Sequence, residues 1–145
     1  MTIMIRIANE NDAPTLARMF EAFNADYRVI TITPEQMAAR LRACAAVEPT
    51  LLAEVDGQQA GFVCVRVVPH MSDDTPYAEV SDLFVEPAFR RQGVGSALLA
   101  AAAHHARERG AHEIVVQTGT DNDNAQALYR RAGYVDYAVA LELML

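Results

Sequence analysis

The segment best suited to chemistry is a loop rich in arginine and glycine. It reads Arg-Arg-Gln-Gly-Val-Gly-Ser over residues 90–96 and lies between an expected strand and an expected helix. Successive backbone N–H groups at a helix start, together with the positive end of the helix dipole, form a binding site for anions. Glycine lets the backbone approach a ligand closely, and Arg90 and Arg91 add positive charge for phosphate oxygens. The loop therefore predicts a phosphate or diphosphate site.

Other glycine-rich phosphate loops fit this segment poorly. A P-loop requires GxxxxGK[ST], whereas the segment contains no lysine and has a different spacing. A dinucleotide-binding fingerprint requires a third glycine where this chain has Leu98. A nucleotide-binding switch is therefore not expected. For the Gly-x-Gly alone, a plain turn carrying solvated arginines remains an alternative.

Residues 83–95, Leu-Phe-Val-Glu-Pro-Ala-Phe-Arg-Arg-Gln-Gly-Val-Gly, resemble the acetyl-CoA motif of the GNAT superfamily of N-acetyltransferases. That motif is a strand ending in an apolar triplet, an acidic-Pro turn, and then (Q/R)xxGx(G/A) opening a helix. The resemblance implies that the loop amides hold the CoA pyrophosphate and that main-chain groups of the strand contact the pantetheine arm and the thioester carbonyl. The implied cofactor-binding residues here are Leu83, Phe84, Val85, Arg90, Arg91, Gln92, Gly93, Val94, Gly95 and Ser96.

A second stretch, from Asn122 to Tyr134, is similar to the other signature of the family, N-x-x-A-x-x-L-Y followed by G-(F/Y). The resemblance implies that Asn122 also binds pantetheine and that Tyr129 protonates the departing CoA thiolate. A tyrosine hydroxyl beside the sulfur is able to supply that proton. Two simpler interpretations stay open, because Asn122 is also a typical helix cap and Tyr129 a typical core aromatic.

The residue that takes the proton from the attacking amine is not supplied by the resemblance. The two positions at which family members carry a glutamate hold Ser81 and Gln117 here. Strand alternation places Glu79 and Ser81 on one face, so we hypothesise that Glu79 accepts the proton, through a water held by Ser81. Asp82 points the opposite way if the strand is regular, although a bulge at the cofactor weakens that objection. A solvated Glu79 and an amine that loses its proton to solvent are the alternatives.

The elements that position these residues follow from periodicity, caps and turns. They predict one α/β (α+β) domain over residues 1–145, with a mixed, mostly antiparallel sheet of about six to seven strands flanked by four helices, the GNAT-like N-acyltransferase fold. The expected strands are Ile3–Ala8, Thr50–Val55, Ala60–Val68, Tyr77–Val85, Glu113–Thr118 and Tyr134–Leu143. The expected helices run through Asn24 and Cys44, over Ser96–Arg109, and from Asp121 to Ala132.

The amino-acid composition limits the classes of partner and the cellular location that we expect for this chain. The net charge of −7, from 12 Lys+Arg and 19 Asp+Glu, disfavours a nucleic-acid footprint and suits a cationic amine. No apolar run approaches the ~20 residues of a membrane span, and neither a leader sequence nor a metal-ligand pattern is visible. Cys44 and Cys64 form no CxxC pair, so we expect reduced thiols and a cytoplasmic location. The acceptor is expected between Tyr27–Pro34 and Pro69–Tyr77, where His70, Asp73 and Asp74 lie.

Taken together, these patterns predict an N-acetyltransferase that transfers an acetyl group from acetyl-CoA to a primary amine of a small molecule or peptide, by direct attack in a ternary complex. No metal cofactor is expected. The alternative is a catalytically weak or inactive CoA-binding sensor or partner module. The resemblance also implies a homodimer, because homodimers are common in such folds, and the apolar last strand, from Ala138 to Leu145, is the segment available for that contact.

Overall fold

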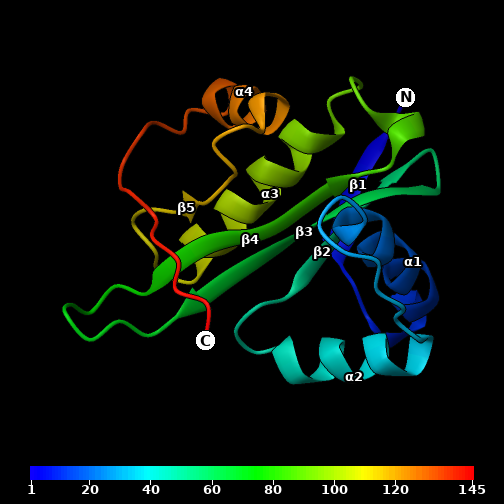
Figure 1. Cartoon of the computed structure of the whole chain (residues 1–145), viewed down its shortest axis with the longest axis horizontal. Coiled ribbons are helices and arrows are strands. Elements are labelled where there is room, and N and C mark those ends of the chain that lie inside the picture. The colour runs from blue at the N-terminus through cyan, green and yellow to red at the C-terminus, as the bar shows by residue number, and fades with distance from the viewer.

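The computed structural model describes every residue from Met1 to Leu145. Its centre is a five-stranded sheet in the order β1-β2-β3-β4-β5, antiparallel from β1 to β4 and parallel between β4 and β5 (Figure 1). The strands are β1 (Ile3–Ile7), β2 (Thr50–Val55), β3 (Gln58–Val68), β4 (Tyr77–Val85) and β5 (Val115–Val116). The helices are α1 (Ala13–Asn24), α2 (Pro34–Cys44), α3 (Val94–Glu108) and α4 (Asp123–Arg131), with short 3-10 turns at Glu10–Asp12 and Pro87–Phe89.

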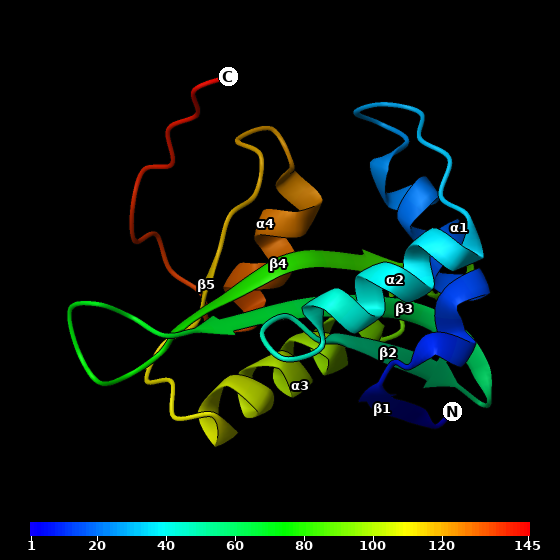
Figure 2. The ribbon, with the colours of Figure 1, turned by 90° about the horizontal axis from the view of Figure 1, so that it is seen from below.

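The helices form a layer on each face of the sheet, as Figure 2 shows from below. Neighbouring residues of β3 point to opposite faces, and each belongs to a different core cluster. Phe62 is fully buried in the cluster that contains Leu16 and Met19 of α1. Val63 packs in the cluster that contains Leu98 of α3 and Tyr129 of α4. Helices α1 and α2 therefore cover one face, and α3 and α4 cover the other.

Local sequence signals account for most element boundaries. A capping box forms at the start of α2, because the Gln36 N–H donates to Thr33 Oγ1 (3.1 Å) and the Thr33 N–H donates to Gln36 Oε1 (2.9 Å). Asp56 and Gly57 join β2 to β3 as a two-residue turn, and both have positive φ, 48° and 83°. That combination is typical of a tight hairpin turn.

The prediction of a mixed, mostly antiparallel sheet with four helices is confirmed, but the predicted six to seven strands are wrong. The segment predicted as a strand over residues 113–118 contributes only the two residues of β5. The segment predicted as a strand over residues 134–143 is extended chain without a strand partner. Alternating apolar residues show that a segment suits a strand, but the partner that satisfies its peptide groups is decided in three dimensions. None of the helices has both the length and the apolar character needed to cross a membrane.

Candidate active site

The site begins where β4 and β5 separate. These two strands pair only at Glu79 with Val115 and at Val80 with Val116, so the rest of β4 lacks a neighbour on that side. On the other side, the Glu86 N–H donates to Ala60 O (2.8 Å). Peptide groups alternate in direction along a strand, so those of Leu83 face away from β3 and into the opening.

The loop after β4 offers a run of free amide groups. None of the backbone N–H groups from Arg91 to Ser96 donates to a backbone acceptor within the chain. Arg91 (φ 60°) and Gly93 (φ 86°) both adopt the left-handed conformation, and α3 begins at the next residue, Val94. Successive amides in such a turn form a concave anion site, which the N-terminus of the 15-residue helix α3 reinforces. This geometry fits a diphosphate.

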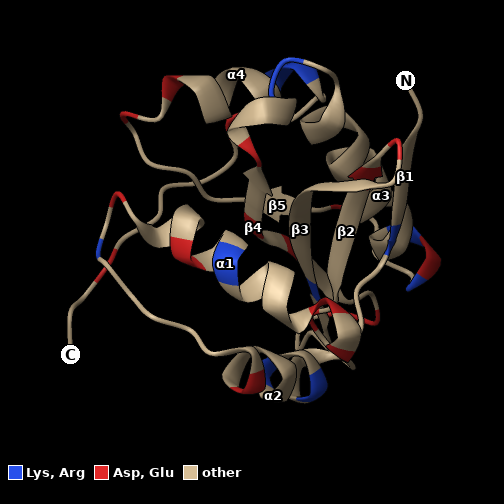
Figure 3. Cartoon of the chain, turned by 90° about the vertical axis from the view of Figure 1, so that its right-hand side faces the viewer, with Lys and Arg blue, Asp and Glu red and all other residues tan.

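The arginine and glutamine side chains of the loop differ in their contacts and in whether they line the cavity. Arg90 lies against the end of β4, where its Nε donates to Val85 O (2.9 Å) and its guanidinium lies 6.0 Å from the centre of the Phe84 ring. Arg91 is exposed and lines the cavity described below. The Gln92 side chain donates to a carbonyl of its own turn and does not line the cavity. Figure 3 shows this basic stretch at the same end of the molecule as α4.

Other predicted loop residues serve packing as well as binding. Val94 is buried in the core beneath the loop, whereas Ser96 is exposed at the cavity. A Cβ added at Gly95 would lie 2.9 Å from a methyl group of Leu128, so this glycine allows α4 to approach α3. Gly93 has no atom within 4 Å of such a Cβ, and its requirement is the positive φ alone.

Replacing Gly93 with alanine is therefore expected to weaken acetyl-CoA binding about tenfold. Holding an L-residue in the left-handed region costs about 1–2 kcal/mol. The loop relieves that strain by changing its backbone conformation, which turns its amide groups away from the diphosphate site and weakens binding by a similar free energy. Isothermal titration with acetyl-CoA measures the change. Gly57→Ala is the matched control, because Gly57 has a similar φ of 83° and open space around it but lies in the β2–β3 turn. An unchanged Kd for Gly93→Ala, or an equal loss in Gly57→Ala, would contradict the role of the loop geometry.

Tyr129 lies on α4, with its ring buried and its hydroxyl at the cavity. Its side chain is 8% exposed and packs edge-on against Tyr134, with 5.8 Å between ring centres. Burial, helped by the neighbouring Tyr134 and by the charge of Asp82, raises the pKa of Tyr129 to about 12. The hydroxyl therefore keeps its proton at neutral pH and can donate it.

Asn122 caps α4 and also lines the cavity, so its two interpretations are compatible. Its Oδ1 accepts from the Ala125 N–H (3.2 Å) and caps α4. The residue also lines the cavity, where its side-chain NH₂ group is available to a ligand.

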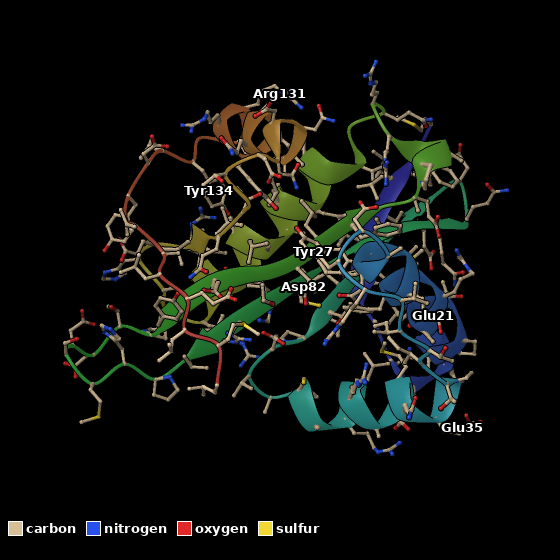
Figure 4. The ribbon with its side chains drawn as sticks, in the orientation of Figure 1. Glu21, Tyr27, Glu35, Asp82, Arg131 and Tyr134 are labelled. Carbon is tan, nitrogen blue, oxygen red and sulfur yellow. The ribbon has the colours of Figure 1, made fainter.

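The two motifs meet in one large cavity of about 1340 Å³. This volume exceeds the roughly 300–1,000 Å³ of sites for drug-sized ligands, so it has room for an extended ligand. Its lining contains the strand end, the loop and the α4 motif, and also residues that sequence reasoning did not assign to a site. Figure 4 labels three residues of the lining, Tyr27 and Asp82 near the centre of the molecule and Arg131 on α4, of which only Arg131 was not considered from the sequence.

A bulge in β4 determines which carboxylate enters this cavity. The register pairs Val80 with Val65 but Asp82 with Cys64, so Ser81 is an extra residue with no partner. Beyond the bulge the alternation of β4 is reversed. Directly opposed residues of neighbouring strands share a face. Because Arg66, Cys64 and Phe62 alternate regularly on β3, their partners Glu79, Asp82 and Phe84 share the face covered by α1.

The prediction that Asp82 points to the opposite face from Glu79 is therefore wrong. Glu79 does not line the cavity. It accepts a hydrogen bond from the Tyr77 hydroxyl (2.8 Å) and lies 3.3 Å from the guanidinium of Arg66, which keeps both of its oxygens engaged. Ser81 does line the cavity, and its hydroxyl donates to Cys64 O (3.3 Å).

Asp82 is the carboxylate that sequence reasoning set aside. Its side chain is half-buried and lines the same cavity as Tyr129. Burial raises the pKa of Asp82 to about 6, with a further contribution from the carboxylate of Glu48. A carboxylate in this range is largely ionised at neutral pH but is a better proton acceptor than an ordinary aspartate.

Of the two segments expected around the acceptor, the first contributes to the cavity lining and the loop of the second does not. Tyr27, the first residue of the segment Tyr27–Pro34, lines the cavity, and so does its neighbour Asp26, which the prediction did not include. The loop over residues 69–76 forms the tip of the long β3–β4 hairpin and contributes no cavity residue (Figure 1). Within it, Asp73 accepts from the Thr75 N–H (2.6 Å), so this carboxylate stabilises the turn.

Comparisons with known proteins agree with this geometry. The model of the acetyltransferase (GNAT) family matches residues 16–134. The chain is 33% identical over 135 residues to the uncharacterized N-acetyltransferase YhfO of Bacillus subtilis, covering 90% of this chain and 88% of that protein. It is also 39% identical over 94 residues to a mycothiol acetyltransferase of Cellulomonas flavigena, covering 61% of this chain. It spans only 27% of that longer relative.

Solved structures show the same fold. An aminoglycoside acetyltransferase from an uncultured soil metagenomic sample, in complex with sisomicin, superposes with a TM-score of 0.83 at 24% identity, over 99% of this chain and 96% of that one. An aminoglycoside N-acetyltransferase in complex with CoA gives a TM-score of 0.83 at 19% identity, over 99% of this chain and 95% of that one. The match to the family model, the similarity to YhfO and the shared fold lead to one conclusion: the chain belongs to the GNAT family of acetyltransferases.

Proposed function

We propose that this acetyltransferase transfers the acetyl group of acetyl-CoA to a primary amine of a cationic small molecule or peptide. The observation that carries the proposal is the lining of a single cavity by three features. These are the free amides of the loop, the protonated hydroxyl of Tyr129 and the carboxylate of Asp82. The first fits the diphosphate of CoA, and the other two supply the proton donor and the proton acceptor of an acyl transfer.

The proposed reaction proceeds by direct attack. The loop amides and the peptide groups of Leu83 hold the thioester arm beside β4. The carboxylate of Asp82 removes a proton from the ammonium group of the acceptor and leaves a neutral amine, whose nitrogen forms a bond to the thioester carbon. The carbon–sulfur bond then breaks, and Tyr129 gives its proton to the departing thiolate. The acylated nitrogen releases its second proton, which restores the Tyr129 hydroxyl, and Asp82 returns its proton to solvent. The products are an N-acetylated amine and CoA.

The preference for a cationic acceptor rests on the distribution of charge around the cavity. Arg90, Arg91 and Arg131 line its cofactor side, which suits the phosphates of CoA. Asp26 and Asp82 line the same cavity, and Asp26 lies beyond the end of α1. Opposite charges within one cavity attract the anionic cofactor and a cationic acceptor to different places. Figure 4 shows this separation between Arg131 on α4 and Asp82 near the centre.

A thiol-release assay with acetyl-CoA and a panel of amines tests the proposal. The panel contains an aminoglycoside, a polyamine, free amino acids and peptides with a free N-terminus. We expect turnover with at least one cationic amine and slower turnover with neutral amines of similar size. Tight binding of acetyl-CoA with no turnover on any amine would instead support the alternative of a CoA-binding module without catalysis.

A further inference from the structure

A second cavity, of about 260 Å³, also reaches Asp82. Asp82 lies near the centre of the molecule and lines both cavities (Figure 4). In the second cavity it is joined by Thr50 and Cys64, and by Glu48 from the turn between α2 and β2. Glu48 does not line the active-site cavity, so any effect of this carboxylate on the acceptor passes through Asp82.

Two rows of side chains cross the sheet at this place, on the face that α1 covers. The first row contains Thr50, Cys64 and Asp82, and the second contains Glu48, Arg66 and Glu79. Glu48 belongs to the second row because the backbone on either side of it accepts hydrogen bonds from the N–H groups of Val65 and Val67, 3.2 and 2.8 Å long, on either side of Arg66. Neighbouring rows of a sheet lie roughly 7 Å apart, so the charges of the second row act on Asp82.

The three charges of the second row do not cancel. Arg66 Nη2 lies 2.7 Å from Glu48 Oε1, and Arg66 Nη1 lies 3.3 Å from Glu79 Oε1, so one guanidinium serves two carboxylates and one negative charge is in excess. Glu79 also accepts a hydrogen bond from the Tyr77 hydroxyl. Glu48 Oε1 is buried, and no group is aligned to donate a hydrogen bond to it. Glu48 is therefore the less satisfied of the two carboxylates.

We propose that Glu48 is a positioning residue for the acyl transfer: held by Arg66, its carboxylate faces Asp82 through the second cavity and makes Asp82 a stronger proton acceptor. One negative charge disfavours another nearby, so Asp82 takes up a proton more readily beside Glu48. This role rests on the proposed function, in which Asp82 accepts the proton of the amine. The pKa of Asp82 agrees with it, because burial and then Glu48 raise that pKa most, Arg66 lowers it and Glu79 adds a smaller increase.

The other titratable and charged groups around Asp82 carry no charge or are exposed. In the active-site cavity they are Asp26, Tyr27, Arg90, Arg91, Tyr129 and Arg131, and in the second cavity they are Arg40, Cys44, Cys64, His105 and Arg109. Burial raises the pKa of Cys64 and lowers the pKa of His105, so both side chains are uncharged at neutral pH. Asp26, Arg40 and Arg109 are exposed, so solvent and salt screen their charges.

Carbon-13 NMR of the Asp82 carboxyl group tests the proposal in the protein without substrates. In Glu48→Gln we expect the pKa of Asp82 to fall by about half a pH unit, because the remaining pair of Arg66 and Glu79 is neutral. In Arg66→Met we expect it to rise by a similar amount, because two carboxylates then lack their counter-charge. A merely loosened fold would lower the pKa in both variants by exposing Asp82 to water.

Glu54→Gln is the matched control. Glu54 is a carboxylate of β2 that is also paired with an arginine, Arg6 (2.9 Å), but it lines neither cavity. Its replacement removes the same charge and is expected to leave the pKa of Asp82 unchanged. Circular dichroism of each variant checks that the fold is retained.

The pH dependence of kcat/KM gives the second readout, with an amine identified from the panel. The acidic decline is expected to move to lower pH in Glu48→Gln and to higher pH in Arg66→Met, in step with the pKa of Asp82. Above about pH 8, Glu48→Gln is expected to lose less than about threefold in kcat/KM, because a slightly weaker base still removes the proton.

The two readouts separate the possible failures. If the pKa of Asp82 does not fall in Glu48→Gln, or moves in the same direction in Glu48→Gln and Arg66→Met, the role of Glu48 is overturned even in an active enzyme. If the pKa moves in opposite directions but the acidic decline stays fixed, Asp82 is not the base. That result overturns the proposed proton transfer, and the role of Glu48 with it.

Discussion

Replacing Tyr129 with phenylalanine is expected to lower kcat about 100-fold, with little change in the KM for acetyl-CoA. In the proposed reaction the hydroxyl of Tyr129, a residue that lines the cavity, donates the proton, and its raised pKa of about 12 keeps it protonated until then. Without it, the departing thiolate must take its proton from water. The measurement is steady-state thiol release with an amine identified from the panel.

Tyr134→Phe is the matched control for that experiment. Tyr134 packs against the same ring, but its hydroxyl is buried without a hydrogen-bond partner. Removing an unsatisfied hydroxyl is expected to leave kcat nearly unchanged and to hold or raise the Tm, because an unpaired buried polar group costs about 1–3 kcal/mol. Equal kcat values for the wild type and Tyr129→Phe would exclude Tyr129 as the proton donor.

Replacing Asp82 with asparagine is expected to lower kcat/KM about 100-fold at pH 7 and to change the shape of the pH profile. Only ionised Asp82 accepts a proton, so the kcat/KM of the wild type falls as the pH drops through about 6. In Asp82→Asn this acidic decline disappears, and the remaining rate follows deprotonation of the amine substrate alone. A pH–rate series from pH 5 to 9 separates the two curves.

Two controls test whether the lost activity comes from the lost carboxylate of Asp82. Glu79→Gln removes the other carboxylate on the same face of β4, but Glu79 does not line the cavity, so the acidic decline is expected to persist. Stability gives the second control, because the folded-state pKa of Asp82 lies above its usual value of 3.8. Such a group favours the fold below the unfolded pKa and loses that contribution as the pH rises through about 6. Asp82→Asn is therefore expected to match or exceed the wild-type Tm at pH 7, and a lower Tm would point to unfolding as the cause of lost activity.

The local sequence determined the four helices, the first four strands and the two motifs of the site. A loop such as residues 90–96 is recognisable because its glycine and its position before a helix act within a few residues. The same holds for the cap at Asn122 and the Asp56-Gly57 turn. These features depend on φ preferences and on hydrogen bonds to near neighbours, which the sequence specifies directly.

The tertiary structure decided which carboxylate of β4 lines the cavity. A bulge at Ser81 moves Asp82 onto the face of Glu79, and only the register with β3 shows where the extra residue lies. The cavity likewise combines Asp26 with a loop more than sixty residues away in the chain. The segment after Tyr134 has the pattern of a strand but no strand partner within its own chain. Register, pairing and burial arise between distant segments, so periodicity along the chain predicts that a strand is possible, whereas its neighbours determine what it does.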